Sequence, residues 1–406
     1  IWVTGVQTCA LPISLPICGG VVMAAMAREL ARRHEVTVLT SRAGDLPAEH
    51  ADGGVRVVRV PVWFRRGLAT ANLASMAAYL PMGFLRGLSL GRRQAFDVVN
   101  THFVVPTGPL GQALAHRMRV PNVLSVHGGD LYDPSKRMSP HRHAVLRGVV
   151  AALLRRADAL VAQSRDTAAN VSQIYRVSRV PDLVPLGIER PPSGIRGARA
   201  QFGIPENAFV MVTIGRVVAR KAAPQLVRVL AALGPDAHLV IVGDGPELAA
   251  VQRIAGELGV ASRTHCLGFV DDATKHRALA ISDLFVSTSQ HEGFGLVFLE
   301  AMAFGLPVVC YDRGGQVDFL STPATGAVVR LNDVDAFTAA VRELERAPAL
   351  RDAIRERNRS RVEGFFIDRC AAAYESIFER ALVERSRNLT AIWRSEERRV
   401  GKECRS

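Results

Sequence analysis

A regular alternation of short β-strand patterns and helix-length segments constrains the fold of this chain more than any other feature. Apolar, β-branched runs such as EVTVLT (35–40) and HLVIVGDG (238–245) are separated by segments with helical spacing of apolar residues. This order is typical of a parallel sheet with helices on both faces. The alternation breaks once, where proline and glycine cluster at 183–194, and then resumes. The sequence therefore predicts an α/β protein with two facing, doubly wound, Rossmann-like domains.

The expected strands are near-continuous apolar runs, which are typical of strands buried on both faces of a sheet. Ligands bind such sheets beyond the carboxyl ends of the strands, and a cleft between two domains is the usual site. We therefore expect the functional residues in the loops that follow the strands. The expected strands are 35–40, 55–62, 96–101, 122–127, 158–162, 208–215, 238–245, 263–268, 283–288, 307–311 and 326–330.

The charge balance points to anionic partners, because the net charge is +13. Arginine is spread along the whole chain and aromatic residues make up only 6%, which favours phosphate ligands or a membrane surface over nucleic acid. No run reaches the eighteen apolar residues of a membrane span. The six cysteines show no paired spacing, so we expect a reducing, cytoplasmic setting.

Two loops of the second domain carry features of a phosphate site. In IGRVVARK (214–221), Gly215 allows close backbone approach, and Arg216 and Lys221 place two cations beside an expected helix start. Cations and free helix N–H groups suit a diphosphate, although a solvated basic surface would look the same. In VGDGPE (242–247), Gly243 ends a strand, and a simple turn before a helix explains that sequence equally well.

The stretch EGFGLVFLE (292–300) places two carboxylates around a glycine-rich helix start. Glu292 lies in the loop before the expected helix, and Glu300 lies about one turn inside it. The amides of the first turn can receive a phosphate or a sugar hydroxyl. The alternative for Glu292 is favourable interaction with the helix dipole, and for Glu300 a surface position. The glycine pair of RGG (313–315) follows the next strand and could also approach a ligand.

In the first domain, His102 and His127 follow successive expected strands, which places both near the cleft, although a single histidine is more often structural. The segment 62–93 mixes aromatic, apolar and arginine residues. It fits either contact with a lipid acceptor or anionic membrane, or a core helix whose arginines reach water, and we favour the core helix slightly.

Taken together, these motifs resemble family 4 glycosyltransferases (glycosyl transferases group 1), which are retaining enzymes of the GT-B fold. The likeness rests on GR followed by Lys221, VGDGPE, EGFGLVFLEAMAFGLPVV (292–309) and RGG, in the family's order, and extends from Gly19 to about Phe378. It implies that Arg216 and Lys221 hold the diphosphate of a UDP- or GDP-sugar and that Glu300 holds the ribose. It also implies that the transferred sugar and distal phosphate meet Glu292 and the amides of Gly293, Phe294, Gly295 and Leu296, with Gly243 in the donor site.

For the first domain, the resemblance implies that His127 lies beside the reacting sugar. Gly19 and Gly20 match a glycine pair that approaches donor and acceptor. His102 would assist acceptor binding, and Asp130 would either orient the acceptor or cap the following turn. The family needs no metal or cofactor, and DVD (333–335) reads instead as a helix cap.

The predicted function is transfer of a sugar from a nucleotide-diphosphate sugar to a hydroxyl of a glycan or lipid-linked acceptor, as in cell-envelope polysaccharide synthesis. The enzyme would be cytoplasmic, with possible peripheral contact to the inner face of the membrane and no nucleic-acid partner. Two alternatives are a nucleotide-sugar epimerase of the same fold and a non-catalytic nucleotide-sugar binding protein.

Both ends of the chain resemble translated sequencing-library adapters. The matching stretches are VTGVQTCALPI (3–13) and RSEERRVGKEC (394–404), so we expect residues 1–14 and 394–406 to be artefacts. The first domain would then span 15–187, the donor domain 188–365 and a C-terminal helix 366–393. The first strand of the first sheet would be missing, or IWVTGV (1–6) would fill its place.

Overall fold

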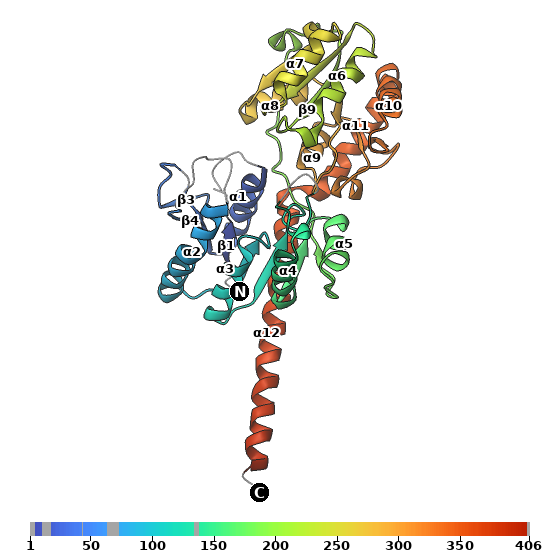
Figure 1. Cartoon of the computed structure of the whole chain (residues 1–406). Helices are drawn as coiled ribbons and strands as arrows, with labels where there is room; N and C mark the ends of the chain where they lie inside the picture. Colours follow the sequence, from blue (N-terminus) through green and yellow to red (C-terminus); the bar gives the residue numbers. More distant parts are fainter. Residues whose placement is uncertain (1–4, 10–17, 43, 63–72, 134–137, 404–406) are drawn as a thin grey trace. The chain divides into compact units, whose positions relative to one another are not determined.

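A computed structural model describes residues 5–9, 18–42, 44–62, 73–133 and 138–403 of the chain. The chain forms two compact units (Figure 1). Unit 1 comprises Ile1–Gly187 together with Ile367–Ser406, and unit 2 comprises Ile188–Phe366. Each unit contains one open, mainly parallel sheet with helices packed on it, which confirms the predicted architecture of two doubly wound α/β units.

The sheet of unit 1 has the strand order β3-β4-β2-β1-β5-β6-β7-β8. All neighbouring strands are parallel except β3 and β4, which form an antiparallel pair at one edge. The strand order reverses between β1 and β5. The bounds are β1 (Gly5–Cys9), β2 (Val36–Ser41), β3 (Glu49–Asp52), β4 (Val55–Val60), β5 (Val99–His102), β6 (Asn122–Val126), β7 (Ala159–Ala162) and β8 (Asp182–Leu183).

The sheet of unit 2 is parallel throughout, with the strand order β11-β10-β9-β12-β13-β14. Its order reverses between β9 and β12. The bounds are β9 (Phe209–Ile214), β10 (Ala237–Val242), β11 (Thr264–Gly268), β12 (Leu284–Ser287), β13 (Val308–Tyr311) and β14 (Gly326–Val329).

The helices alternate with these strands. In unit 1 they are α1 (Cys18–Ala31), α2 (Leu73–Arg93), α3 (Gly108–Met118), α4 (Ala144–Arg156), α5 (Arg165–Gln173) and α12 (Ile367–Glu403), with the 3₁₀ turn η1 (Pro140–Arg142). In unit 2 they are α6 (Ala223–Ala231), α7 (Leu248–Glu257), α8 (Asp272–Ala280), α9 (Leu296–Ala303), α10 (Val334–Arg346) and α11 (Pro348–Val362), with the 3₁₀ turns η2 (Arg199–Phe202), η3 (Ala219–Lys221), η4 (Ala261–Arg263), η5 (Gly315–Asp318) and η6 (Glu363–Phe365).

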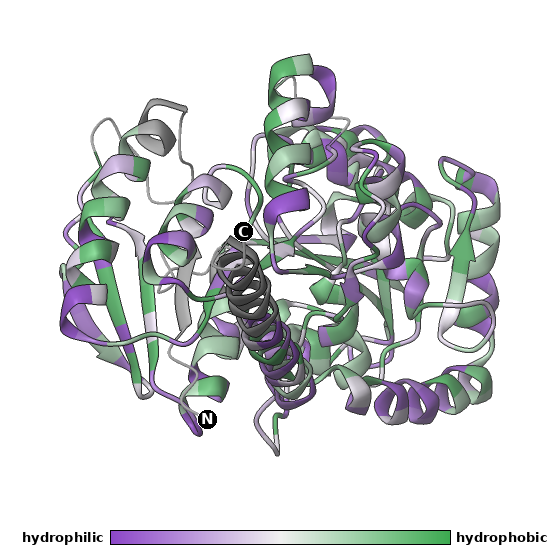
Figure 2. Cartoon of the chain, turned by 90° about the horizontal axis from the view of Figure 1, so that it is seen from below, coloured by the Kyte–Doolittle hydropathy of each residue, from purple (hydrophilic) through white to green (hydrophobic). Residues whose placement is uncertain are grey.

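The cores form because the central strands are buried on both faces, as their apolar runs predict. Every residue of β10 and of β12 is buried. Helices add apolar stripes to this layer: on α10, Phe337, Val341 and Leu344 recur at helical spacing and are all buried. In Figure 2 the strands inside each unit are mostly hydrophobic, and hydrophilic residues lie mainly on the outer helices and loops.

The first strand of unit 1 lies outside the bounds expected for the first domain. Gly5–Cys9 forms β1, which pairs with β2 along its length and with β5 at Thr8. The central place of the sheet is therefore filled by part of the segment 1–14, which was set outside the domain. The sequence raised two alternatives, a missing strand and a place filled by residues 1–6. The place is filled, but by Gly5–Cys9, which shares only Gly5 and Val6 with the expected segment.

The C-terminal helix was expected at 366–393 as a segment of its own, but α12 is part of unit 1. Its Glu375 pairs with Arg33 at 2.9 Å and with His34 at 2.8 Å, next to the end of α1. Further along, Arg380 pairs with Asp182 at 2.7 Å. The N-terminal part of α12 thus packs on the other elements of unit 1. Unit 2 ends at Phe366, which forms a β-bridge with Ile188. Helix α12 continues to Glu403, beyond the expected end at 393.

The segment 62–93 is described only in part, because residues 63–72 lie outside the described residues. Leu73–Arg93 forms α2, and its buried Tyr79 donates a hydrogen bond to the carbonyl of Leu39 on β2 at 3.0 Å. Gly83 and Gly87 face the side chains of Leu110 and Leu114 on α3. Helix α2 therefore packs as a core helix, the favoured alternative, although Leu85 is exposed.

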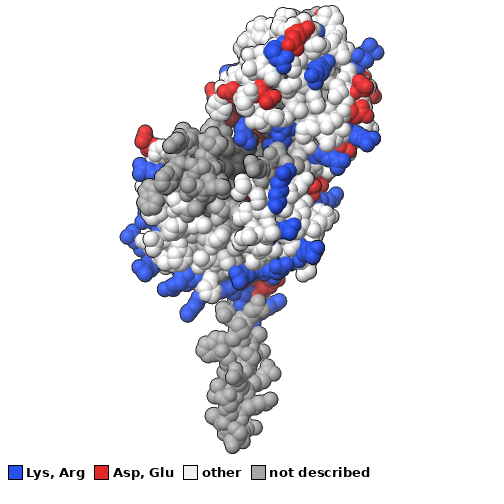
Figure 3. Space-filling model, viewed as in Figure 1, with Lys and Arg blue, Asp and Glu red and all other residues white. Residues whose placement is uncertain are grey.

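Surface charge follows the sequence pattern. Lys and Arg side chains are scattered over the visible face of each unit in Figure 3 and do not gather in one patch. Among the described helices, none combines the length and the apolar character that crossing a membrane would require.

Candidate active site

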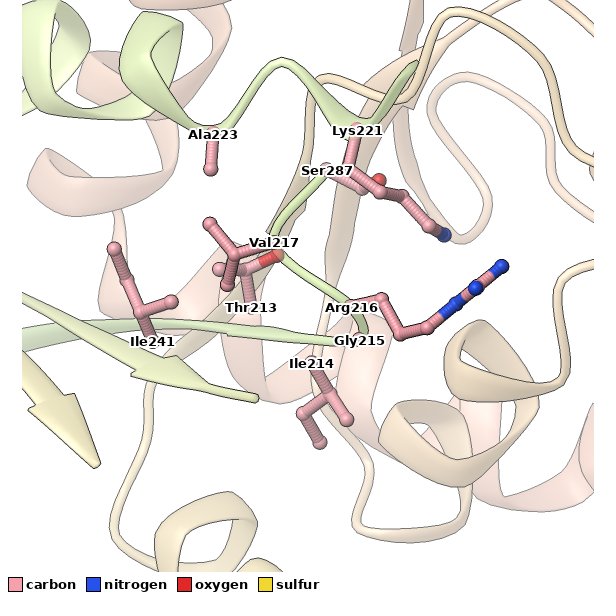
Figure 4. A pocket seen from close by; sticks show the side chains of 9 residues that line it. All are labelled: Thr213, Ile214, Gly215, Arg216, Val217, Lys221, Ala223, Ile241 and Ser287. Atoms are coloured by element: carbon pink, nitrogen blue, oxygen red, sulfur yellow. The ribbon is translucent and has the colours of Figure 1, made fainter. Parts of the chain in front are cut away.

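A small pocket in unit 2 lies beyond the carboxyl ends of β9 and β12, where the strand order of the sheet reverses. This is the position at which open α/β sheets bind ligands. Arg216 and Lys221 extend toward the same side of the pocket, past the turn at Gly215 (Figure 4). The pocket is lined by Thr213, Ile214, Gly215, Arg216, Val217, Lys221, Ala223, Ile241 and Ser287.

The turn after β9 is held by the loop after β10. A Cβ added at Gly243 would lie 2.0 Å from the carbonyl oxygen of Gly215, and the φ of Gly243 is +138°, so only glycine fits there. Backbone hydrogen bonds complete the contact, from Gly215 N to Val242 O at 2.9 Å and from Val217 N to Asp244 O at 2.9 Å. Gly243 therefore positions the Arg216 turn by packing against it.

A buried ion-pair cluster forms the next part of the site. The Lys221 ammonium donates a hydrogen bond to Glu292 Oε1, and the Arg220 guanidinium lies 3.8 Å from Glu292 Oε2. Burial alone would raise the pKa of Glu292, but Lys221 and Arg220 outweigh it and lower that pKa. Arg220 also donates to the carbonyl of His291 at 2.5 Å. Glu292 is therefore a charged carboxylate with fixed partners.

Arg216 differs from Lys221 in that its side chain is exposed. In the described part of the chain, no carboxylate pairs with its guanidinium. Arg216 can therefore bind an anion without first giving up an ion pair, whereas Lys221 would have to bind an anion while it also holds Glu292. Two neighbouring cations of this kind suit a diphosphate.

The loop of Glu292 is held by the glycine pair after β13. Glu292 and Gly314 form a bridge, and the amide of Gly315 donates to the carbonyl of Glu292 at 2.9 Å. A Cβ at Gly314 would lie 1.9 Å from that carbonyl oxygen, and the φ of Gly314 is +116°. The sequence suggested that this pair could bring backbone to a ligand, and that stays a prediction; the structure shows the pair in contact with the Glu292 loop.

Helix α9 begins at Leu296 with Gly295 as its N-cap. Glycine has no side chain to accept from the first N–H groups, which suits this end of the helix to an anion or a hydroxyl. The ring of Phe294 is buried, with its centroid 5.2 Å from that of Phe319. Of the predicted residues Gly293 to Leu296, Phe294 can therefore meet a ligand only through its backbone.

Glu300 lies one turn inside α9 and has a separate cationic partner. Lys275 on α8 donates to Glu300 at 3.1 Å and pairs with Asp272 at 2.8 Å. Burial would lower the pKa of Lys275, but Glu300 and Asp272 outweigh it and raise that pKa. The two carboxylates of the 292–300 stretch thus have different partners, which fits the expectation that they act at different points.

In unit 1, His102 at the end of β5 and His127 just after β6 lie in contact. His102 Nδ1 is 3.0 Å from His127 Nε2, and the ring centroids are 5.2 Å apart. Burial lowers the pKa of His127 to about 4 and also lowers that of His102. Both imidazoles are therefore neutral at pH 7.

The His127 loop is fixed by backbone hydrogen bonds. Asp130 accepts from the amide of His127 at 2.9 Å and from the amide of Val104 at 2.7 Å. Gln163, just after β7, donates to the carbonyl of His127 at 2.8 Å. Of the two alternatives for Asp130, these contacts favour the cap of the turn over direct contact with an acceptor.

The remaining predicted residues are less informative. Gly19 and Gly20 lie in the first turn of α1, directly after residues that the structure does not describe. Asp333 caps α10 by accepting from the amide of Ala336 at 2.9 Å, which confirms the cap interpretation of DVD. Within the described ranges, no group of three or more His, Cys, Asp or Glu could hold a metal.

Two family descriptions match the sequence in succession. Residues 19–190 match "Glycosyltransferase Family 4" and residues 195–361 match "Glycosyl transferases group 1". The GDP-mannose-dependent alpha-(1-6)-phosphatidylinositol monomannoside mannosyltransferase of Mycolicibacterium smegmatis is 30% identical over 354 residues, which cover 81% of this chain and 86% of that protein. This chain belongs to the family 4 glycosyltransferases.

Other relatives agree with this assignment. The 2-deoxystreptamine glucosyltransferase of Streptomyces kanamyceticus is 28% identical over 298 residues, 69% of this chain and 77% of that protein. Sucrose-phosphate synthase from Thermosynechococcus elongatus has a TM-score of 0.78 at 19% identity, covering 94% of this chain and 100% of that one. Anabaena HepE in complex with UDP-glucose has a TM-score of 0.72 at 18% identity, covering 92% and 99%. The glycosyltransferase therefore has the predicted GT-B fold.

Several contacts of this glycosyltransferase were not predicted. In the sequence, Arg220 was only one of several basic residues, and nothing in the neighbouring sequence predicted its contact with the Glu292 loop. The contacts of Lys275 and Gln163 were not predictable from neighbouring residues either, because only the tertiary fold brings each to its partner. The position of Gln163 directly after β7 is the one clue, since other site residues also follow strands.

The buried histidines of the glycosyltransferase predict how its stability depends on pH. Seven described histidines have lowered pKa values, with burial as the largest cause in each: His50, His102, His127, His141, His238, His265 and His276. An unfolded histidine has a pKa of about 6.5, so below this pH the unfolded chain binds protons that the folded chain does not. The contribution of His127 to the free energy of unfolding is therefore present above pH 6.5 and is lost as the pH falls from 6.5 to about 4. The contributions of the other six histidines fall in the same direction below pH 6.5.

Urea unfolding at pH 7.5 and 5.5 measures this loss. We expect the free energy of unfolding to be about 1 kcal/mol lower at pH 5.5 from His127 alone, with the other histidines adding to it. Equal or greater stability at pH 5.5 would contradict the assignment of neutral, buried imidazoles.

Proposed function

We propose that this enzyme transfers a sugar from a nucleotide-diphosphate sugar to a hydroxyl group of a glycan or lipid-linked acceptor, with retention of anomeric configuration. The observation that carries the proposal is the pair of cations at the switch point of unit 2, one of which contacts Glu292 in the loop that leads to the glycine N-cap of α9. A diphosphate carries the charge that this arrangement suits, and its departure is the step that cations accelerate.

Unit 2 would bind the donor. Arg216 and Lys221 would hold the diphosphate and stabilise the negative charge that develops as the sugar leaves. The amides from Gly293 to Leu296 would meet the distal phosphate and the sugar, and Glu292 would accept hydrogen bonds from sugar hydroxyls. Glu300, which accepts from Lys275, has its second oxygen to offer to a ribose hydroxyl.

Unit 1 would contribute His127, which as a neutral imidazole can donate one hydrogen bond and accept another. The acceptor hydroxyl would attack the same face of the sugar that the phosphate leaves, and the departing phosphate would take the hydroxyl proton. No residue of the chain then has to serve as a strong base, which agrees with the neutral histidine pair.

Donor and acceptor classes are supported by relatives. The Mycolicibacterium smegmatis relative is named for GDP-mannose and a phosphatidylinositol mannoside, and Anabaena HepE was solved with UDP-glucose. We propose a UDP- or GDP-sugar donor, no metal or cofactor, and a cytoplasmic enzyme that meets its acceptor at the membrane surface.

Nucleotide binding to the full chain tests this proposal. A thermal shift with UDP, GDP and ADP at about 100 times the dissociation constant corresponds to about 2.7 kcal/mol of stabilisation. We expect a response to UDP or GDP, followed by sugar transfer from the matching donor. Donor turnover without an acceptor would favour the epimerase, and no response to any nucleotide would contradict the proposal.

The variant Glu300→Ala tests the ribose contact. We expect nucleotide affinity to fall about 10- to 100-fold, because a hydrogen bond to a charged group is lost. Lys275 keeps Asp272 as a partner, so the fold should tolerate the change. The control is Glu257→Ala on α7, which removes an exposed carboxylate and should leave affinity unchanged. Unaltered affinity in Glu300→Ala would remove the ribose role.

A further inference from the structure

A buried line of hydrogen bonds runs through unit 1 from the C-terminal helix to His127. Tyr374 on α12 donates to Ser125 Oγ at 2.9 Å, and Ser125 donates to Asn100 Oδ1 at 3.3 Å. Asn100 Nδ2 lies 3.0 Å from His102 Nε2, and His102 Nδ1 lies 3.0 Å from His127 Nε2. Side chains from α12, β6 and β5 thus form one continuous line of hydrogen bonds that ends at His127.

The chemistry of these groups sets the direction of the line. Ser125 donates to the oxygen of Asn100, which leaves the amide nitrogen of Asn100 facing His102. An amide nitrogen only donates, so His102 Nε2 accepts. A neutral imidazole then carries its proton on Nδ1, and in His102 that atom faces His127 Nε2. His127 Nε2 accepts in turn, so the proton of a neutral His127 lies on Nδ1.

We propose that this line fixes His127 as the Nδ1–H tautomer and thereby determines which ring atom donates a hydrogen bond to the substrate. Tyr374, Ser125, Asn100 and His102 are then positioning residues that act through His127. The inference rests on the proposed function, in which His127 faces the reacting sugar.

Burial supports the assignment. Tyr374, Ser125, Asn100 and His102 are each at most 3% exposed, so solvent has little access to exchange the partners along the line. The loop of His127 is held at the same time by Asp130 and Gln163, and the ring of Phe103 has its centroid 4.4 Å from that of His127. The lowered pKa of each histidine keeps both rings neutral, which the tautomer argument requires.

The consequence for the reaction is that His127 offers a hydrogen-bond donor at one defined ring atom. A free histidine in water can present either tautomer, but here His102 occupies Nε2, so Nδ1–H is the donor of the ring. The side chain of Gln163 also hydrogen-bonds to His127, so a substrate oxygen would share this donor with Gln163 or displace it. Such a group orients a hydroxyl or ring oxygen and stays a hydrogen-bond donor without becoming an acid. Tyr374 contributes to this selection although it touches no substrate.

Long-range ¹H–¹⁵N NMR of the full chain, labelled on histidine, tests the proposal without any substrate. The His127 signals are assigned by their loss in His127→Gln. We expect Nδ1 of His127 to be protonated in the unaltered protein. Tyr374→Phe and His102→Leu should give a mixture of tautomers, because each interrupts the line. His102→Asn should restore the Nδ1–H form, since its amide nitrogen is as many bonds from Cα as Nδ1 is.

Kinetics supply the second readout and a matched control. We expect kcat/KM to fall about 3- to 10-fold in Tyr374→Phe, the effect of weakening one hydrogen bond. Tyr79→Phe removes another buried phenol whose hydroxyl donates to a backbone carbonyl, on α2, and should lower the melting temperature comparably while leaving tautomer and kcat/KM unchanged.

Two results would overturn the inference: a proton on Nε2 of His127 in the unaltered protein, or an unchanged tautomer in both Tyr374→Phe and His102→Leu. If the tautomer is as expected and no sugar nucleotide is used, the proposed function fails while the hydrogen-bond line stands.

Discussion

Replacing Lys221 by methionine is expected to lower the rate of sugar transfer about 10²- to 10³-fold, the usual loss when one group that stabilises a departing anion is removed. The same change should also destabilise the fold. Glu292 is only 7% exposed and would keep Arg220 at 3.8 Å as its remaining cation. A buried charge that loses its partner costs about 3–5 kcal/mol, and Arg220 should bring the loss to the lower end of that range.

A double-mutant cycle separates the two effects. Glu292→Gln in the Lys221→Met background removes the unpaired carboxylate, so most of the stability should return while transfer stays slow. Urea unfolding and the rate of transfer are measured for all four proteins. Arg253→Met is the control: its pair with Glu257 is more than half exposed, and losing it should change stability by less than about 1 kcal/mol.

The result that would count against this account is specific. If the double variant were no more stable than Lys221→Met, the pairing of Lys221 with Glu292 would not be what holds the loop. If Lys221→Met kept normal activity, the ammonium would have no role at the leaving group.

Gly314→Ala should be strongly damaging to the candidate site of unit 2. The added Cβ would lie 1.9 Å from the carbonyl oxygen of Glu292 and 2.7 Å from its amide nitrogen. The φ of +116° is also unfavourable for alanine. Because backbone on both sides must move, we expect a loss of about 3 kcal/mol or more in unfolding free energy, together with loss of nucleotide binding.

Gly256→Ala is the matched control for this prediction. Gly256 lies in α7, and beyond its chain neighbours and the nearby backbone of its own helix nothing lies within 4 Å of the added Cβ. Alanine should therefore be neutral or stabilise by up to about 1 kcal/mol. Melting temperatures and nucleotide affinity of the two variants are compared with the unaltered protein. A Gly314→Ala protein that melts and binds normally would show that the contact with Glu292 is dispensable.

Local patterns were enough to predict the fold, because strands buried on both faces leave continuous apolar runs and each is followed by a turn. Val308–Tyr311 and Phe209–Ile214 are examples, found within one or two residues of their expected ends. The edge strand Glu49–Asp52 was missed, since a half-exposed polar strand has no apolar run. The return of α12 to unit 1 was missed as well, because helical spacing does not reveal which sheet a helix covers.

The candidate site was predictable to the extent that its residues follow strands. Arg216 and Lys221 share one loop and were identified together, but the contact of Lys221 with Glu292 joins residues 71 positions apart. The bond between Tyr374 and Ser125 spans 249 positions. The sequence also suggested a ligand-facing role for Gly314, which stays a prediction, but gave no sign that its lack of a side chain permits contact with the Glu292 loop. Side-chain partners of this kind depend on the tertiary fold.

The bridge between Ile188 and Phe366 means that the first and last residues of unit 2 lie side by side. In unit 1, a Cβ at Gly187 would lie 2.7 Å from the Cα of Ile367. The two residues of unit 1 that flank unit 2 in the sequence are therefore adjacent as well. Unit 2 is in this sense an insertion, and proteins tolerate insertions where the ends lie close together. A unit from a relative with another sugar nucleotide could be exchanged at this junction, leaving the sheet of unit 1 and its C-terminal helix uninterrupted.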